Sequence, residues 1–126
     1  LGGPVAWIDA RDIADVAAEA LTAPGYEGKA LGLTGPEALA GDDIAALLSG
    51  VTGRTVSCVS LSAEDARAGM VAGGMQDEVA GAMVELASIA PRGYLAGIET
   101  TVSEVLERPA RRFADFVTEN RDAFVK

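Results

Sequence analysis

The stretch that decides the fold is Val5–Ala23, VAWIDARDIADVAAEALTA. It opens with the apolar run Val5–Ile8, which predicts a short β-strand. The sequence then changes to helical periodicity, with apolar side chains at i, i+3, i+4, i+7 and i+8: Ile13, Val16, Ala17, Ala20 and Leu21. Asp9 stands where the two patterns meet and can cap the first turn of the helix. We therefore predict a strand that leads directly into a helix at Asp9.

Three charged residues at this junction are candidate functional residues. Asp12 is expected near the positive end of the helix dipole, and the planar guanidinium of Arg11 can hold a phosphate or a carboxylate. In α/β folds, ligands meet polar groups where a strand ends and a helix begins. We predict Asp9 and Arg11 as substrate-binding residues and Asp12 as a catalytic residue. A helix cap with a local Asp–Arg ion pair would account for the same residues, and such caps are common.

After Val5–Ala23, the sequence predicts alternating strands and helices, followed by helices alone. Further strands are expected at 30–34 and 55–61, where β-favouring residues gather. Periodicity and capping signals predict helices at about 9–23, 41–51, 62–71, 76–89, 100–106 and 111–122. The prediction is a single partial α/β domain with about three short strands and about five to six helices. Its β-α-β-α-β part covers 1–61, and the mainly helical part covers 62–126.

The alternation favours parallel pairing of the strands through right-handed crossovers. Three parallel strands make a poor isolated sheet, because parallel sheets need helices on both faces and usually more strands. We therefore expect the chain to belong to a larger sheet. Its first residue is Leu1 rather than Met, which is expected of a processed product or a piece of a longer chain.

The composition limits the possible partners. The formal net charge is −9, with 19 acidic and 10 basic residues. This balance disfavours nucleic acid, because phosphate binding needs a basic surface. Basic side chains gather only weakly, at Arg108, Arg111 and Arg112. No apolar run approaches the ~20 residues that span a bilayer, so no membrane partner is expected.

The residue types present also limit the catalytic and metal-binding chemistry open to the chain. With one cysteine, Cys58, and no histidine, the usual zinc and haem sites and Ser–His–Asp catalysis are excluded. An internal disulfide is impossible, which favours a cytoplasmic location. Cys58 itself is expected to be a small buried apolar residue. An acid or base would have to be Asp, Glu, Lys or Tyr.

Three segments together resemble a known family: VAWIDARDIADVAAEAL, then GKALGLTGPEALAGDDIAALLSGVTGRTVSCVSLS, and finally RPARRFADFVTEN. They look like the C-terminal half of NmrA-like proteins, which are atypical short-chain dehydrogenases/reductases and include NAD(P)H:quinone reductase-like enzymes and redox-sensing regulators. The resemblance implies a Rossmann fold whose N-terminal half binds NAD or NADP at a glycine-rich turn. Its C-terminal part supplies a last strand or two and a helical lobe that closes over the substrate.

The cofactor half of that family is absent from this sequence. No G-x-G-x-x-G follows a predicted strand, since Gly69, Gly73 and Gly74 lie within or after a helix pattern. The superfamily's Tyr-x-x-x-Lys pair is also missing. We therefore expect NAD(P) to be bound only when an N-terminal half is supplied, and no cofactor to be bound by this chain alone.

Four further residues complete the predicted site. Tyr94, in an irregular loop, is a candidate catalytic residue because a phenol can donate a proton to a bound carbonyl; simple exposure is the alternative. Trp7 is a candidate for stacking on the substrate, although core packing is the commoner role. Met70 and Met75 could form a flexible apolar wall for a ring-shaped substrate, or pack between helices.

Two functions remain open on this evidence. The first is the substrate-binding C-terminal portion of an NAD(P)-dependent NmrA-like oxidoreductase, acting on a quinone-like or carbonyl substrate. Its partners would be a small apolar substrate and the missing N-terminal half. The second is a truncated module that works alone without a nucleotide, as a small-molecule-binding, regulatory or cyclase/isomerase-type protein. Such a module would form a homodimer by pairing exposed strand edges.

Overall fold

The helix after Asp9 forms where the periodicity predicts it. In the computed structural model, which describes residues 2–125, α1 spans Ala10–Thr22. Asp9 is its N-cap, and the carboxylate accepts the backbone N–H of Arg11 at 2.8 Å. Of the apolar stripe, Val16 is fully buried. The predicted cap and the predicted helix are both confirmed.

The other helices follow the predicted pattern closely, with one difference. They are α2 Gly41–Thr52, α3 Ala63–Ala72, α4 Asp77–Ile89, the 3₁₀ turn η1 Ala90–Arg92, α5 Thr101–Leu106, α6 Phe113–Glu119 and α7 Arg121–Phe124. The single helix expected at 111–122 is wrong, because the chain turns at Asn120 and forms two short helices. There the backbone N–H and the side-chain amide of Asn120 both donate to the carbonyl of Phe116, which ends α6.

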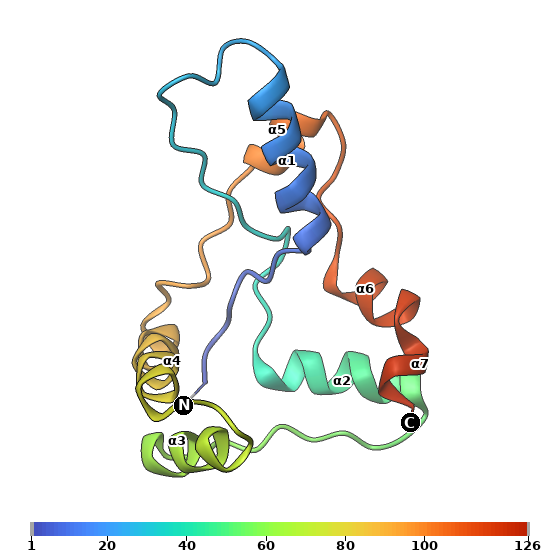
Figure 1. Cartoon of the computed structure of the whole chain (residues 1–126). Helices are drawn as coiled ribbons and strands as arrows, with labels where there is room; N and C mark the ends of the chain where they lie inside the picture. The colour runs from blue at the N-terminus through green and yellow to red at the C-terminus, as the bar shows by residue number, and fades with distance from the viewer. Residues whose placement is uncertain (1, 126) are drawn as a thin grey trace.

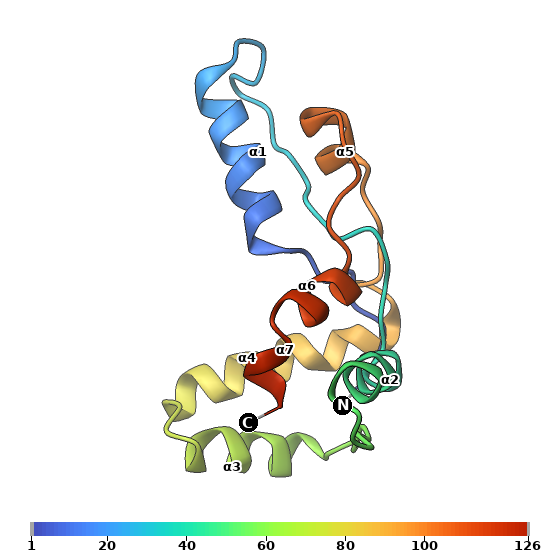
Figure 2. The same cartoon turned by 90° about the vertical axis from the view of Figure 1, so that its right-hand side faces the viewer.

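The helices form three groups rather than one bundle. α1 packs against α5 at one end of the molecule, α3 and α4 form a hairpin, and α2 packs against α6 and α7 (Figure 1). The view turned by 90° shows the same separation, with the α1–α5 pair standing clear of the other helices (Figure 2). Extended segments connect these groups.

The three predicted strands do not form. Within residues 2–125 there is no β-strand, and the only β-pairing is an isolated antiparallel bridge between Val5 and Leu39. The parallel pairing that we expected is therefore wrong for this chain. The segments at 30–34 and 55–61 carry no ladder, because a strand needs a neighbour of matching length and the described part of the chain supplies none.

The Val5–Ile8 segment is held by backbone hydrogen bonds to two other parts of the chain. Val5 exchanges two with Leu39, at 3.0 and 2.9 Å. Ala6 donates to the carbonyl of Leu95 at 2.8 Å and accepts from Gly35 at 3.2 Å. This segment therefore joins the turn at 35–39 to the loop after η1, and it fixes where Trp7 and Asp9 lie.

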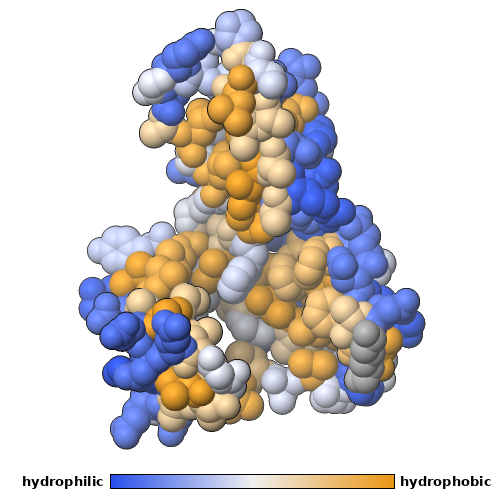
Figure 3. All heavy atoms as spheres, in the orientation of Figure 1, coloured by the Kyte–Doolittle hydropathy of each residue, from blue (hydrophilic) through white to orange (hydrophobic). Residues whose placement is uncertain are grey.

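Much apolar surface stays exposed. Figure 3 shows hydrophobic residues gathered over several elements of the face it displays. The most exposed large apolar side chains include Leu21, Val59 and Tyr94. Cys58 is exposed as well, so its expected burial is wrong: the extended segment 55–61 that carries it is exposed along its whole length. No helix within residues 2–125 combines the length and the apolar character that crossing a membrane requires.

Candidate functional site

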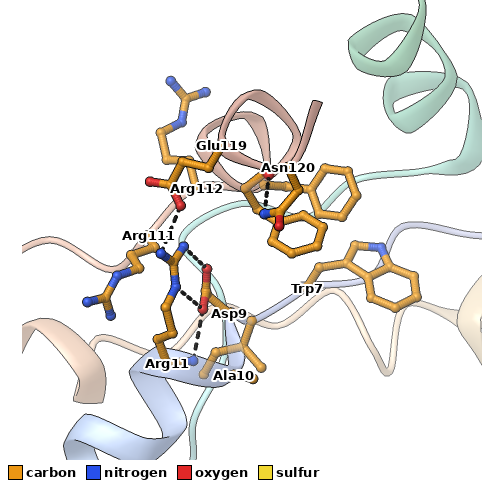
Figure 4. A pocket seen from close by; sticks show the side chains of 11 residues that line it. Trp7, Asp9, Ala10, Arg11, Arg111, Arg112, Glu119 and Asn120 are labelled. Atoms are coloured by element: carbon orange, nitrogen blue, oxygen red, sulfur yellow. Dashed lines mark hydrogen bonds and ion pairs between the residues drawn. The ribbon is translucent and has the colours of Figure 1, made fainter. Parts of the chain in front are cut away.

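A cavity of about 720 Å³ lies between the start of α1 and α6. One wall comes from the end of the Val5–Ile8 segment and the first turn of α1, and the other comes from α6 and the residues just before it (Figure 4). The lining residues are Trp7, Ile8, Asp9, Ala10, Arg11, Arg111, Arg112, Phe113, Phe116, Glu119 and Asn120.

The cavity has an aromatic part. Trp7, the only tryptophan of the chain, is 47% exposed and contributes to its lining. Phe113 and Phe116 face it from α6, with their ring centroids 5.9 Å apart. Aromatic faces of this kind favour flat, conjugated ligands, because stacking buries apolar area at little conformational cost.

The polar part is an ion-paired set that crosses between the two walls. Arg11 donates to both carboxylate oxygens of Asp9, at 2.9 and 2.6 Å. The same guanidinium reaches Glu119 on α6 at 2.8 Å. The hydrogen bond from Arg11 lowers the pKa of Asp9 to about 2, and the bonds to Asp9 and Glu119 raise the pKa of Arg11. At neutral pH both groups are charged, so their chemistry suits holding a polar or charged group better than transferring a proton.

A buried carboxylate lies behind this polar set. Asp12 has no exposed area, and its Oδ1 accepts from Arg108 at 2.8 Å and from the guanidinium of Arg111. Its Oδ2 accepts the backbone N–H of Arg111 at 2.8 Å. Asp15 binds the same two arginines, at 2.7 and 3.0 Å, but is half exposed. These interactions leave Asp12 paired, buried and outside the cavity lining.

The predicted site residues thus separate into four places. Trp7, Asp9 and Arg11 are brought together in the cavity, and Asp12 lies behind it. Tyr94 is 73% exposed in the loop after η1 and does not line the cavity. The two methionines belong to the other end of the molecule, where Met70 lies in α3 and Met75 in the turn before α4.

Sequence reasoning missed the wall that α6 contributes. The signal available was the weak basic patch of Arg108, Arg111 and Arg112. In the structure these arginines neutralise carboxylates of this chain: Arg108 and Arg111 bind Asp12 and Asp15, and Arg112 binds Glu37 at 2.9 Å. A patch that is paired internally gives no phosphate-binding surface.

The N-termini of α1 to α4 do not fit the pyrophosphate of a dinucleotide. Such a group binds at a helix N-terminus with free N–H donors and no negative charge. Here α1 begins with a capping aspartate, and the first turns of α2, α3 and α4 each carry two carboxylates. Nor do residues 2–125 contain a cluster of His, Cys, Asp and Glu that could hold a metal ion.

No protein-family model matches the chain, but individual proteins do. It is 50% identical over 122 residues to an NAD(P)H azoreductase of Xenophilus azovorans, an alignment that covers 97% of this chain and 43% of that protein. Among solved structures, an NADPH-dependent quinone oxidoreductase from Escherichia coli matches with a TM-score of 0.85 and 28% identity over 93% of this chain and 42% of that one. A Citrobacter triphenylmethane reductase shares the fold, with a TM-score of 0.81 and 22% identity over 94% of this chain and 41% of that one.

The chain therefore spans about two-fifths of the length of the relatives it matches. Its helices and extended segments correspond to a part of Rossmann-like reductases that use NAD(P)H, which supports the expected fold class at this coarser level. Over nearly its whole length, the chain resembles the C-terminal part of the NmrA-like, atypical short-chain dehydrogenases/reductases, as the three quoted segments predict.

Proposed function

We propose that this chain forms the substrate-side part of an NAD(P)-dependent reductase and that the cavity between α1 and α6 receives a flat, quinone-like or carbonyl substrate. The observation that carries this proposal is the pairing of an aromatic lining with an ordered guanidinium in one cavity. The names of the relatives point the same way, since they associate reductase activity with azo compounds, a quinone and triphenylmethane.

Arg11 has donors to spare for such a substrate. A guanidinium carries five N–H groups. Nε and one N–H of Nη2 are used by Asp9, and one N–H of Nη1 is used by Glu119. One N–H therefore remains on each Nη, and either can donate to a substrate oxygen while Trp7 stacks on the ring. Residues outside this chain would bind the nicotinamide that supplies the hydride.

The other predicted site residues enter this proposal differently. Asp12 and Tyr94 as catalytic residues, and Met70 and Met75 as substrate contacts, stay predictions. None of the four lines the cavity. The two methionines lie on or beside α3, so a role for them would require the α3–α4 hairpin to close over a bound substrate.

The experiment uses two proteins: the chain alone, and the chain joined to the N-terminal part of the Xenophilus azovorans azoreductase that it does not match. Calorimetry should show NADPH binding to the joined protein and none to the chain alone. Stoichiometric binding by the chain alone would contradict the assignment of the cofactor site to other residues. The joined protein should also oxidise NADPH when a quinone is added.

A matched pair of variants tests the site within the joined protein. Arg11→Lys keeps the charge but loses the planar fork, so KM for the quinone should rise roughly tenfold, as expected for a lost charged hydrogen bond. The affinity for NADPH should stay unchanged. Arg67→Lys changes an arginine that donates in the same two-bond way to Asp77 on the α3–α4 hairpin; it is the control and should leave KM unchanged. An unchanged KM in Arg11→Lys would rule out this role for Arg11.

The second candidate is a module that works without the cofactor half. The observation that favours it is the exposed apolar surface, which a second copy could cover as well as an N-terminal half could. Sedimentation of the chain alone distinguishes the two. A discrete dimer would favour the module, and concentration-dependent, open-ended association would favour the reductase.

A further inference from the structure

The two walls of the cavity belong to helices whose main partners lie elsewhere. α1 packs against α5, whereas α6 packs against α2. Figures 1 and 2 show α1 and α6 in different groups of helices, with the segment that leads from α5 into α6 running between them. The separation of the walls must therefore be fixed by a few contacts between the start of α1 and the residues just before α6.

Asp12 supplies the most constrained of these contacts. It is fully buried, and it binds Arg111 twice, once through the guanidinium and once through the backbone N–H. The backbone bond matters most, because it fixes the main chain and not only a flexible side chain. From Arg111 the chain passes directly into Arg112 and Phe113, which line the cavity.

The neighbouring ion pairs constrain the walls less. Asp15 binds only the side chains of Arg108 and Arg111 and is half exposed. The Arg11–Glu119 pair also joins the walls, but both side chains are about half exposed, and such pairs are weak and screened by salt. Asp12 alone combines complete burial with a bond to the opposite backbone.

We propose that Asp12 is a positioning residue that sets the distance between the two walls of the substrate cavity by fixing the backbone at Arg111. Asp12 does not line the cavity itself. It acts on the cavity walls through its bonds to Arg111 and Arg108. This inference rests on the proposed function only in taking the cavity as the substrate site. An ion pair that merely stabilised the fold would change the melting temperature without changing the cavity.

The test uses the full chain and the fluorescence of Trp7, its only tryptophan. Duroquinone is the probe, because methyl groups occupy the ring positions at which the exposed thiol of Cys58 could otherwise add to a quinone. Asp12→Asn should weaken duroquinone binding roughly tenfold, since the amide leaves Arg108 and Arg111 without their buried charge partner. Asp15→Asn, which removes a charge from the same two arginines, should weaken it less than about threefold.

A measurement without ligand keeps the inference separate from the proposed function. If the walls move apart, acrylamide should quench Trp7 more strongly in Asp12→Asn than in the wild type or in Asp15→Asn. Unchanged quenching with wild-type helicity would overturn the inference while leaving the proposed function intact. Another outcome is that quenching of Trp7 increases while neither the wild type nor any variant binds duroquinone. In that case the proposed function fails, and the role of Asp12 in positioning the walls stands.

A second variant covers the case in which Asp12→Asn does not fold. Arg108→Gln removes one donor to Asp12 and leaves every lining residue unchanged. It should increase the quenching of Trp7 in the same direction. Where both single variants fold, the double variant should show no greater change than Asp12→Asn alone, because both act through one buried group. An additive change, or no change in Arg108→Gln, would overturn the inference.

Discussion

The carboxylate of Asp9 both caps α1 and orients the side chain of Arg11. Its Oδ1 accepts both the backbone N–H and the side-chain Nε of Arg11, so the group that caps α1 also aims the guanidinium. The side chain is only 6% exposed although Arg11 is half exposed. The binding group of the proposed site is therefore held by the start of the helix itself.

The ionisation of Asp9 makes this arrangement sensitive to acid. Because the folded pKa of about 2 lies below that of an unfolded aspartate, Asp9 stabilises the fold above about pH 4 and loses this contribution as the pH falls towards 2. Asp9→Asn should remove that part of the pH dependence. Thermal unfolding followed by circular dichroism from pH 6 to pH 2 checks it. Asp42→Asn, at an exposed carboxylate in α2, should instead keep the wild-type profile.

Gly35 is the position where one added methyl group should matter most. A Cβ there would lie 1.7 Å from the carbonyl oxygen of Trp7, so the Val5–Ile8 segment would have to move. Gly35→Ala should lower the melting temperature and change the wavelength at which the fluorescence of Trp7 is greatest. In Gly50→Ala, an added Cβ meets nothing within 4 Å inside α2, so this control should gain about 0.5–1 kcal/mol. Unchanged Trp7 emission in Gly35→Ala would contradict the packing described for that turn.

Some of these residues could be predicted from the sequence and others could not. Asp9 and Arg11 are two positions apart, so the spacing within one helical turn was enough to predict their pairing. Arg108 and Arg111 lie 96 and 99 positions after Asp12, and no local pattern joins such residues. The partner of a buried charge is decided by tertiary structure, which a single sequence does not display.

At the scale of elements, the α1–α5 pair carries much of the buried core. Val16 of α1 and Val102 of α5 are 2% and 1% exposed. Val102→Ala should therefore cost about 2 kcal/mol of unfolding free energy, from lost transfer energy and the cavity left behind. Urea unfolding measures it. Val59→Ala, at a residue 72% exposed, should change the same quantity by less than about 0.5 kcal/mol.

Helices were predictable and strands were not, for a physical reason. A helix closes its hydrogen bonds within its own segment, so periodicity and caps at Asp9 and Ser62 suffice to place it. A strand needs a second strand. The segments at 30–34 and 55–61 have strand-like sequences, but no neighbour within the described chain completes a ladder beside them.

On the scale of the whole molecule, the exposed apolar side chains predict association. Side chains such as Leu21, at 86% exposure, bury little apolar area in the chain alone. Adding the unmatched N-terminal part of the azoreductase should therefore suppress binding of a hydrophobic fluorophore and raise the melting temperature. Titration of one part with the other, followed by fluorophore emission, measures this. A fluorophore signal that persists at saturation would show that this surface serves another partner.

The pairing of Asp12 with Arg108 and Arg111 also has a consequence for biosynthesis. Because the bonds reach across 96 and 99 positions, a growing chain can form α1 early but cannot pair its buried carboxylate until Arg108 and Arg111 have left the ribosome. The α1 wall of the cavity is therefore made before the α6 wall that completes it. A polypeptide truncated just before Arg108 would contain the segments of α1 to α5 but would lack both arginines and the α6 wall of the cavity.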